Sequence, residues 1–171
     1  MLGDLMNRLA DVKGLEWIRL HYAYPSKFPL EILDVMRERD NICNYLDMPL
    51  QHAANNMLKA MKRQITREEM EELTIAIREK VPGICLRTTL IAGFPGETED
   101  DVEELKTFLT KMRFDRVGIF TYSHEEDTGA YGLNDNVPQA EKEERAQEIM
   151  ELQQEISLEK NMEKIGKEFK V

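Results

Sequence analysis

The sequence of 171 residues is poor in cysteine and contains no long apolar segment. Cys43 and Cys85 are its only cysteines, which excludes a disulfide framework and any C-x-x-C metal motif. No stretch approaches the ~18 consecutive apolar residues of a membrane span. The first residues, MLGD, lack the basic and apolar parts of a signal peptide. We therefore expect a cytoplasmic protein with two free thiols.

Basic residues are also scarce. Lys and Arg total 23 against 33 Asp and Glu, which gives a net charge of −10. An acidic domain repels the phosphate backbone, so direct nucleic-acid binding is not expected. This charge favours a basic partner or a cationic ligand. Hydrophobic residues make up 42% of the chain, enough for the core of one domain of ordinary size.

Short apolar runs alternate with helical patterns along the chain. Because this alternation is typical of parallel strands joined by right-handed crossover helices, we expect an α/β fold with about four parallel strands. The long last helix carries an apolar stripe of Ile149, Leu152 and Ile156. Strands are predicted at residues 17–22, 42–48, 84–92 and 116–122, and helices at residues 2–9, 29–39, 54–61, 67–80, 98–112 and 138–165.

Capping residues, prolines and glycines between these elements support the predicted boundaries. Thr98 followed by Asp101 matches a capping pattern, and Pro138 opens the last helix, with Gly166 as its predicted C-cap. Residues 167–171 are expected to begin a further strand. Both ends of the chain suggest a piece of a longer protein, although a complete four-stranded domain is the alternative. In a piece of a longer protein, the first strand would lack a neighbouring strand on one edge, which predicts self-association there.

Polar residues gather on one face of the predicted sheet. Arg19, His21, Asp47, Arg87 and Thr89 alternate with apolar residues, so we expect them to line a concave interior that binds a polar ligand. All three histidines follow a strand: His21, His52 and His124. Ligands of parallel α/β folds bind at that end of the strands, which makes at least one functional histidine a reasonable hypothesis.

The loop at residues 93–97 connects a strand to a helix through Gly93 and Gly96. Two glycines can cradle a phosphate, but the carboxylates at Glu97 and residues 99–101 would repel it. The loop therefore fits a cationic ligand, or it is an ordinary strand–turn–helix connection. The histidines and the acidic residues 125–127 have zinc-ligand chemistry, yet their wide separation disfavours a metal site, and none is predicted.

Three segments carry a specific family resemblance. YLDMPLQHA at 45–53, LKAMKR at 58–63 and LRTTLIAGFPGET at 86–98 strongly resemble the radical S-adenosylmethionine methylthiotransferases. WIRLHY at 17–22, PLQHA at 49–53 and LQQEIS at 152–157 resemble the branch that modifies an aspartate of a small-subunit ribosomal protein. The transfer-RNA branches usually carry Gln-Ser-Gly where this chain has Gln51-His52-Ala53, so a tRNA-modifying fragment is the alternative.

The resemblance implies a partial (β/α) barrel. Residues 1–166 would be its C-terminal portion, and residues 167–171 would start a truncated TRAM-like β-barrel. The family's C-x-x-x-C-x-x-C cluster loop is absent from this sequence. By resemblance, the whole protein would use S-adenosylmethionine and 4Fe-4S clusters and act on a small-subunit ribosomal protein. Because this chain lacks the cluster loop, it would hold no cluster and be inactive alone.

The resemblance also implies cofactor-binding positions, while the catalytic residues stay unassigned. Gln51 and His52 would approach the ribose or methionine part, Arg87 and Thr89 would face the cavity, and Gly93, Gly96 and Glu97 would shape the cofactor site. Gly118 and Thr121 would line the adenine pocket, largely through backbone groups. Two competing hypotheses are a self-contained α/β ligand-binding domain and a docking module that uses its acidic surface and long helix.

Overall fold

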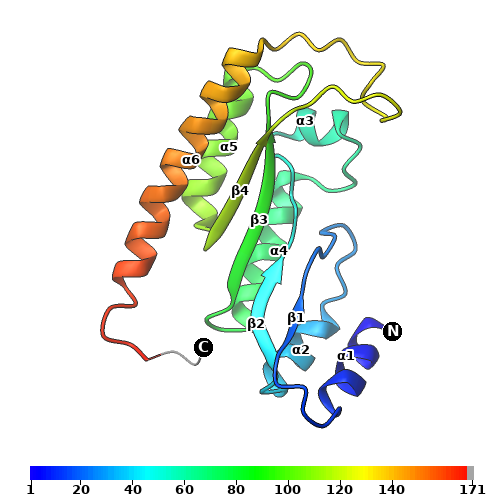
Figure 1. The fold of residues 1–171 in the computed structure, drawn as a ribbon, viewed down its shortest axis with the longest axis vertical. Coiled ribbons are helices and arrows are strands. Elements are labelled where there is room, and N and C mark those ends of the chain that lie inside the picture. Colours follow the sequence, from blue (N-terminus) through cyan, green and yellow to red (C-terminus); the bar gives the residue numbers. More distant parts are fainter. Residues whose placement is uncertain (169–171) are drawn as a thin grey trace.

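The chain folds around one sheet of four parallel strands, as predicted (Figure 1). The computed structural model describes residues 1–168. The strands lie in the order in which they occur along the chain, so each connection moves one position across the sheet. They are β1 (Ile18–Leu20), β2 (Ile42–Asp47), β3 (Cys85–Ala92) and β4 (Arg116–Thr121).

Within residues 1–168, six helices connect or flank these strands, and all six were predicted with shifts of a few residues at their ends. Figure 1 shows α4 behind the centre of the sheet, α5 and α6 on the β4 side, and α1 and α2 on the β1 side. The helices are α1 (Leu2–Ala10), α2 (Glu31–Glu38), α3 (Asn55–Ala60), α4 (Arg67–Lys80), α5 (Glu99–Met112) and α6 (Gln139–Met162).

Helix α5 begins at the capping pattern that the sequence predicts. The Thr98 hydroxyl accepts a hydrogen bond from the Asp101 amide, and the Asp101 carboxylate accepts one from the Thr98 amide. The same reciprocal arrangement joins Thr66 and Glu69 at the start of α4. Each capping box pairs amide groups that the first helical turn leaves without partners, which fixes where both helices start.

Two predicted boundaries were wrong. The first strand ends at Leu20 rather than at residue 22, because Tyr22 has a left-handed backbone (φ 61°) that breaks the extended run. Helix α6 ends at Met162 and is capped by Glu163; Gly166, the predicted C-cap, lies three residues further, in a turn with φ 80°. Of the strand expected at residues 167–171, residues 167 and 168 lie in no strand, and the rest lies outside the described residues.

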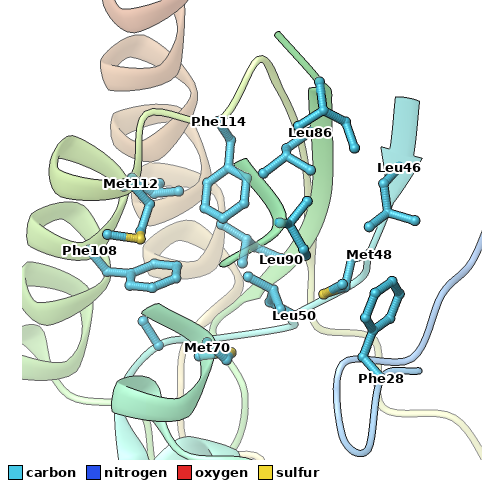
Figure 2. Packing of buried hydrophobic residues seen from close by; sticks show 14 of the residues in the cluster. Phe28, Leu46, Met48, Leu50, Met70, Leu86, Leu90, Phe108, Met112 and Phe114 are labelled. Atoms are coloured by element: carbon cyan, nitrogen blue, oxygen red, sulfur yellow. The ribbon is translucent and has the colours of Figure 1, made fainter. Parts of the chain in front are cut away.

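The core lies between the sheet and the helices. Leu46, Leu86 and Leu90 project from β2 and β3 toward Met70 of α4 and Phe108 of α5 (Figure 2). Each of these five side chains is buried to 3% exposure or less. Along β3 the buried residues alternate with half-buried ones, so one face of the strand packs against the helices and the other looks away from them.

That second face keeps the polar residues together. Arg87, Thr89 and Gly118 share it, because Thr89 pairs with Gly118 across the β3–β4 ladder. Phe120, two residues further along β4, is 60% exposed. The face therefore forms the open side of a partial barrel, as the alternation pattern predicts. No helix among residues 1–168 is long and apolar enough to cross a membrane.

Candidate functional site

A cavity of about 610 Å³ lies over the carboxyl ends of the strands on this open face. Its volume lies within the range of small-molecule sites. Every strand or the loop that follows it contributes to the wall, which places the cavity where parallel α/β folds bind ligands. It is lined by Tyr22, Asp47, Pro49, Gln51, Arg87, Thr89, Ile91, Phe94, Phe120, Thr121, Tyr122, Ser123, Thr128 and Ala130.

An ion pair forms the polar floor of the cavity. Arg87 Nη1 donates to Asp47 Oδ1 at 2.8 Å, and the Asp47 side chain is only 6% exposed. His21 Nδ1 lies 3.8 Å from the other Asp47 oxygen. A Cβ on Gly118 would lie 3.5 Å from Arg87 Nη2 and 3.8 Å from Thr89 Oγ1, so the glycine leaves space open at the floor beside both side chains. The Arg87 guanidinium thus lies at the cavity with its charge balanced by the Asp47 carboxylate.

Two lining residues have an unusual backbone. Gln51 has φ 76° and Tyr22 has φ 61°, the left-handed region that non-glycine residues rarely adopt. Gln51 is held there by its own backbone, since its amide donates to Thr89 O at 3.0 Å and its carbonyl accepts from Ile91 N at 2.9 Å. Residues held in this region cluster at ligand-binding sites. The β2–α3 loop therefore lies against β3 with the Gln51 side chain in the cavity wall.

Aromatic side chains around the cavity have shifted acidities. Burial raises the pKa of Tyr122, and the nearby carboxylates Asp135 and Glu125 raise it further. Burial likewise raises the pKa of Tyr45, with Asp47 adding to the shift. Both phenols therefore stay protonated well above neutral pH and can serve as hydrogen-bond donors.

The loop after β3 is tied down by Glu97. Both of its carboxylate oxygens accept from the Gly93 amide, at 3.0 and 2.9 Å, and Oε1 also lies 3.3 Å from Arg145 Nη1. His52 Nε2 lies 3.6 Å from Oε2, and the His52 and Glu97 side chains are 0% and 1% exposed. The Glu97 carboxylate is therefore satisfied inside the protein, and it does not face the cavity.

Helix α6 supplies two buried cations that the sequence reasoning missed. Arg145 Nη1 also donates to the Glu97 carbonyl at 3.2 Å. Lys142 is 3% exposed, pairs with Asp135 at 2.6 Å, and lies over the Tyr122 ring at 5.0 Å. The signal was in the spacing: positions 142 and 145 extend the stripe of Ile149 and Ile156 toward the helix start.

The structure places the nine sequence-predicted positions in three different environments. Gln51, Arg87, Thr89 and Thr121 line the cavity, and Gly118 lies between two of them. His52 and Glu97, with the Gly93 amide, lie buried beside it, and none of the three residues lines the cavity. Gly96 is exposed, and its amide donates to Asn136 Oδ1 at 2.8 Å. The expected cofactor roles stay predictions for all nine.

The three histidines do not converge. His21 contacts Asp47 and Tyr45, His52 is buried against Glu97, and His124 stacks on Tyr131 with ring centroids 4.9 Å apart. Within the part of the chain that the structure describes, no group of three or more His, Cys, Asp or Glu side chains is arranged to hold a metal ion. The three histidines each follow a strand because of the topology of the sheet, and they do not form one site.

A sheet of parallel strands open on one side, with a cavity at the strand ends, is the architecture of a partial-barrel ligand-binding domain. Residues 1–109, more than half of the chain, match the sequence profile of the Radical SAM superfamily. The chain therefore belongs to that superfamily.

Its curated relatives narrow the comparison. The chain is 58% identical over 99% of its length to the ribosomal protein uS12 methylthiotransferase RimO of Cytophaga hutchinsonii. It is 53% identical to the proteins of the same name from Flavobacterium psychrophilum and Bacteroides thetaiotaomicron. The chain spans 39% of the length of each of these relatives.

Solved structures agree on the fold. Coproporphyrinogen III oxidase (HemN) from Escherichia coli, a radical SAM enzyme, superposes with a TM-score of 0.71 at 21% identity, covering 91% of this chain and 36% of that one. The radical S-adenosylmethionine methyltransferase TsrM from Kitasatospora setae gives a TM-score of 0.55 at 22% identity, covering 70% and 24%. At these identities the likeness concerns the fold alone.

Proposed function

We propose that this chain is the cofactor-binding part of a radical S-adenosylmethionine methylthiotransferase that modifies an aspartate of ribosomal protein uS12. The 58% identity over 99% of the chain to a protein of that name carries the proposal. In this proposal residues 1–166 belong to the partial barrel, residues 167–171 lead into a further β-barrel domain, and the protein works in the cytoplasm.

The cavity fits S-adenosylmethionine in size and in chemistry. A volume of about 610 Å³ accommodates a nucleoside with an amino-acid arm. The Asp47–Arg87 ion pair gives the cavity a polar floor, and Thr89, Gln51 and Thr121 offer hydrogen-bonding side chains. Phe94 and Tyr122 pack edge to face at 5.2 Å and give the wall an apolar part. When bound, the cofactor supplies the radical chemistry of the superfamily.

The cysteines of this chain do not fit an iron–sulfur cluster. Four-iron clusters take a closely spaced set of thiolates, and only Cys43 and Cys85 exist here, on neighbouring strands. Burial raises the pKa of Cys85, and the Asp115 carboxylate raises it further, so its thiol is kept protonated at neutral pH. In the proposal the cluster ligands belong to another part of the whole protein, and this chain alone does not catalyse.

Charge favours a protein substrate over the tRNA alternative. A net charge of −10 repels a phosphate backbone and attracts a basic protein segment. The decisive experiment uses the whole protein with reconstituted clusters, uS12 and bulk tRNA as competing substrates, and mass spectrometry of both products. We expect a methylthio group on one aspartate of uS12 and none on tRNA. Modification of tRNA alone would replace this function with the alternative.

A further inference from the structure

Lys142 lies at the start of α6 and is buried to 3% exposure. A cation is unfavourable there for two reasons, because burial removes its hydration and because the helix dipole makes the first turn positive. An apolar side chain at the same position would avoid both costs. A residue that breaks local rules in this way is expected where a functional site needs its contacts.

The Lys142 side chain touches both loops that follow the last two strands. Its stem lies against the β3–α5 loop, because a Cβ on Gly93 would be only 2.2 Å from Lys142 Cγ. Its ammonium lies where the chain leaves β4, 5.0 Å from the centre of the Tyr122 ring and 3.5 Å from the Tyr122 carbonyl oxygen. One side chain of a distant helix thus connects the carboxyl ends of two neighbouring strands.

Asp135 holds that ammonium in place. Its Oδ2 accepts from Lys142 Nζ at 2.6 Å, and it belongs to the β4–α6 loop. The neighbouring residue makes a second contact between the same two loops, since the Gly96 amide donates to Asn136 Oδ1 at 2.8 Å. The β4–α6 loop is therefore anchored to the β3–α5 loop and to the start of α6 through two adjacent residues.

The side chains held by these contacts form the aromatic part of the cavity wall. Phe94, in the β3–α5 loop, packs edge to face on Tyr122, and both rings line the cavity. Lys142 and Asp135 do not line it. The two rings belong to a small buried cluster that is separate from the main core. A small cluster has little apolar area to fix its own geometry, so the position of the rings depends on the contacts around it.

We propose that Lys142 is a positioning residue for the cofactor: paired with Asp135, it holds Phe94 and Tyr122 as a preformed aromatic wall of the cavity. This inference rests on the proposed function, in which the cavity binds S-adenosylmethionine. A wall that is ordered before binding avoids the entropic cost that ordering a mobile wall would add to binding. Because Lys142 acts through other side chains, it affects the affinity for the cofactor and takes no part in the reaction itself.

The test compares two variants of this ion pair with a matched control. Lys142→Met keeps an unbranched stem beside Gly93 and removes the charge, and Asp135→Asn removes the carboxylate. Lys160→Met is the control, because Lys160 lies near the other end of α6 and also pairs with a buried aspartate, Asp115, at 2.8 Å. Neither residue of that second pair lines the cavity. Calorimetry measures the affinity for S-adenosylhomocysteine, urea unfolding measures stability, and aromatic NMR measures the contact between the two rings.

We expect roughly tenfold weaker binding of S-adenosylhomocysteine in Lys142→Met and in Asp135→Asn, with a weaker nuclear Overhauser effect between the Phe94 and Tyr122 rings. The double variant should bind no more weakly than either single variant, because the two side chains act as a pair. Lys160→Met should lower the urea midpoint and leave the affinity and the ring contact unchanged.

Unchanged affinity in Lys142→Met would overturn the positioning role. So would an equal loss of affinity in Lys160→Met, because the loss would then follow from general destabilisation. A parent chain that binds no S-adenosylhomocysteine would count against the proposed function instead, and the ring contact would then decide. Its persistence in Lys142→Met overturns the role of Lys142, whereas its loss there and not in Lys160→Met supports that role. None of these measurements requires catalysis.

Discussion

His52 directs its Nε2 toward the carboxylate of Glu97 at 3.6 Å, and both side chains are buried. The other ring nitrogen, Nδ1, accepts a hydrogen bond from the Ala54 amide at 2.9 Å. Because an accepting nitrogen carries no proton, the neutral ring has its N–H on Nε2, facing Glu97. The loops after β2 and β3 thus approach each other here without a hydrogen bond at Nε2, and Glu97 is itself bonded to Arg145 of α6.

Replacing Glu97 by Gln should destabilise the protein and loosen the β3–α5 loop. The change leaves Arg145 with only the half-exposed carboxylate of Glu141, 3.3 Å from Nη2, in place of a buried one, which costs about 3 kcal/mol. We expect a matching fall in the free energy of urea unfolding and faster hydrogen exchange of the Gly93 amide. Glu103→Gln is the control, since Glu103 is 59% exposed and pairs only with Lys106 on the surface of α5. Equal effects of the two changes would show that the buried contacts of Glu97 do not stabilise the β3–α5 loop.

Alanine at Gly93 and at Gly96 should have very different consequences. Both glycines have a left-handed backbone, at φ 75° and 86°, which costs alanine about 1 kcal/mol. At Gly93 the new Cβ would also lie 2.2 Å from Lys142 Cγ, whereas nothing lies within 4 Å at Gly96. We expect Gly93→Ala to cost about 3 kcal/mol in urea unfolding and Gly96→Ala about 1 kcal/mol. Similar losses of unfolding free energy at both sites would mean that Lys142 of α6 does not restrict the space at Gly93.

The N-terminus of α5 should lose stability in acid through Asp101. Burial alone would raise the pKa of Asp101, but hydrogen bonds from the Thr98 amide and hydroxyl and from Asn56 outweigh it and lower the pKa below 3.8. A lowered folded-state pKa means that the contribution is present above the unfolded pKa and is lost as pH falls through the folded value.

Asp101→Asn should therefore cost roughly 1 kcal/mol at neutral pH, and the difference from the parent chain should vanish in strong acid. Chemical unfolding across a pH series measures both values. Asp100→Asn, in the same helical turn but exposed, is the control and should change little. A difference that persists unchanged below pH 3 would rule out the charged hydrogen bonds as its origin.

Self-association through β1 stays a prediction, and the structure indicates how to test it. Strand β1 is at one edge of the sheet, has three residues, and shows a register irregularity against β2. The Ile18 amide donates to Asn41 O at 2.7 Å, so by alternation the Arg19 amide points away from β2.

Arg19→Pro removes that outward donor without taking a hydrogen bond from the β1–β2 ladder. We expect the light-scattering mass of the parent chain to rise with concentration and that of Arg19→Pro to rise less. A parent chain that stays monomeric over the whole series would show that α1 and the short strand already protect this edge.

The sequence by itself determined the elements, their order and the parallel sheet. Alternation of apolar residues with period two and with the helical period depends only on local geometry, so it could be read directly, and the capping pair Thr98–Asp101 marked the start of α5. It also placed Arg87, Thr89 and Asp47 on one face of the sheet, since a strand turns successive side chains to opposite sides. The motifs around Gln51 and Gly93 identified the family.

Only the tertiary structure decided which of these residues face the cavity. Glu97 follows β3 at the expected edge, but its carboxylate turns inward to Gly93 and to Arg145, a residue 48 positions later in the chain. The closeness of Lys62 to Gly129 of the β4–α6 loop depends on the same kind of long-range approach. Local pattern sets which face a side chain leaves from, whereas the partner that it meets is set by how distant elements pack. A buried charge then takes whichever opposite charge that packing brings within reach.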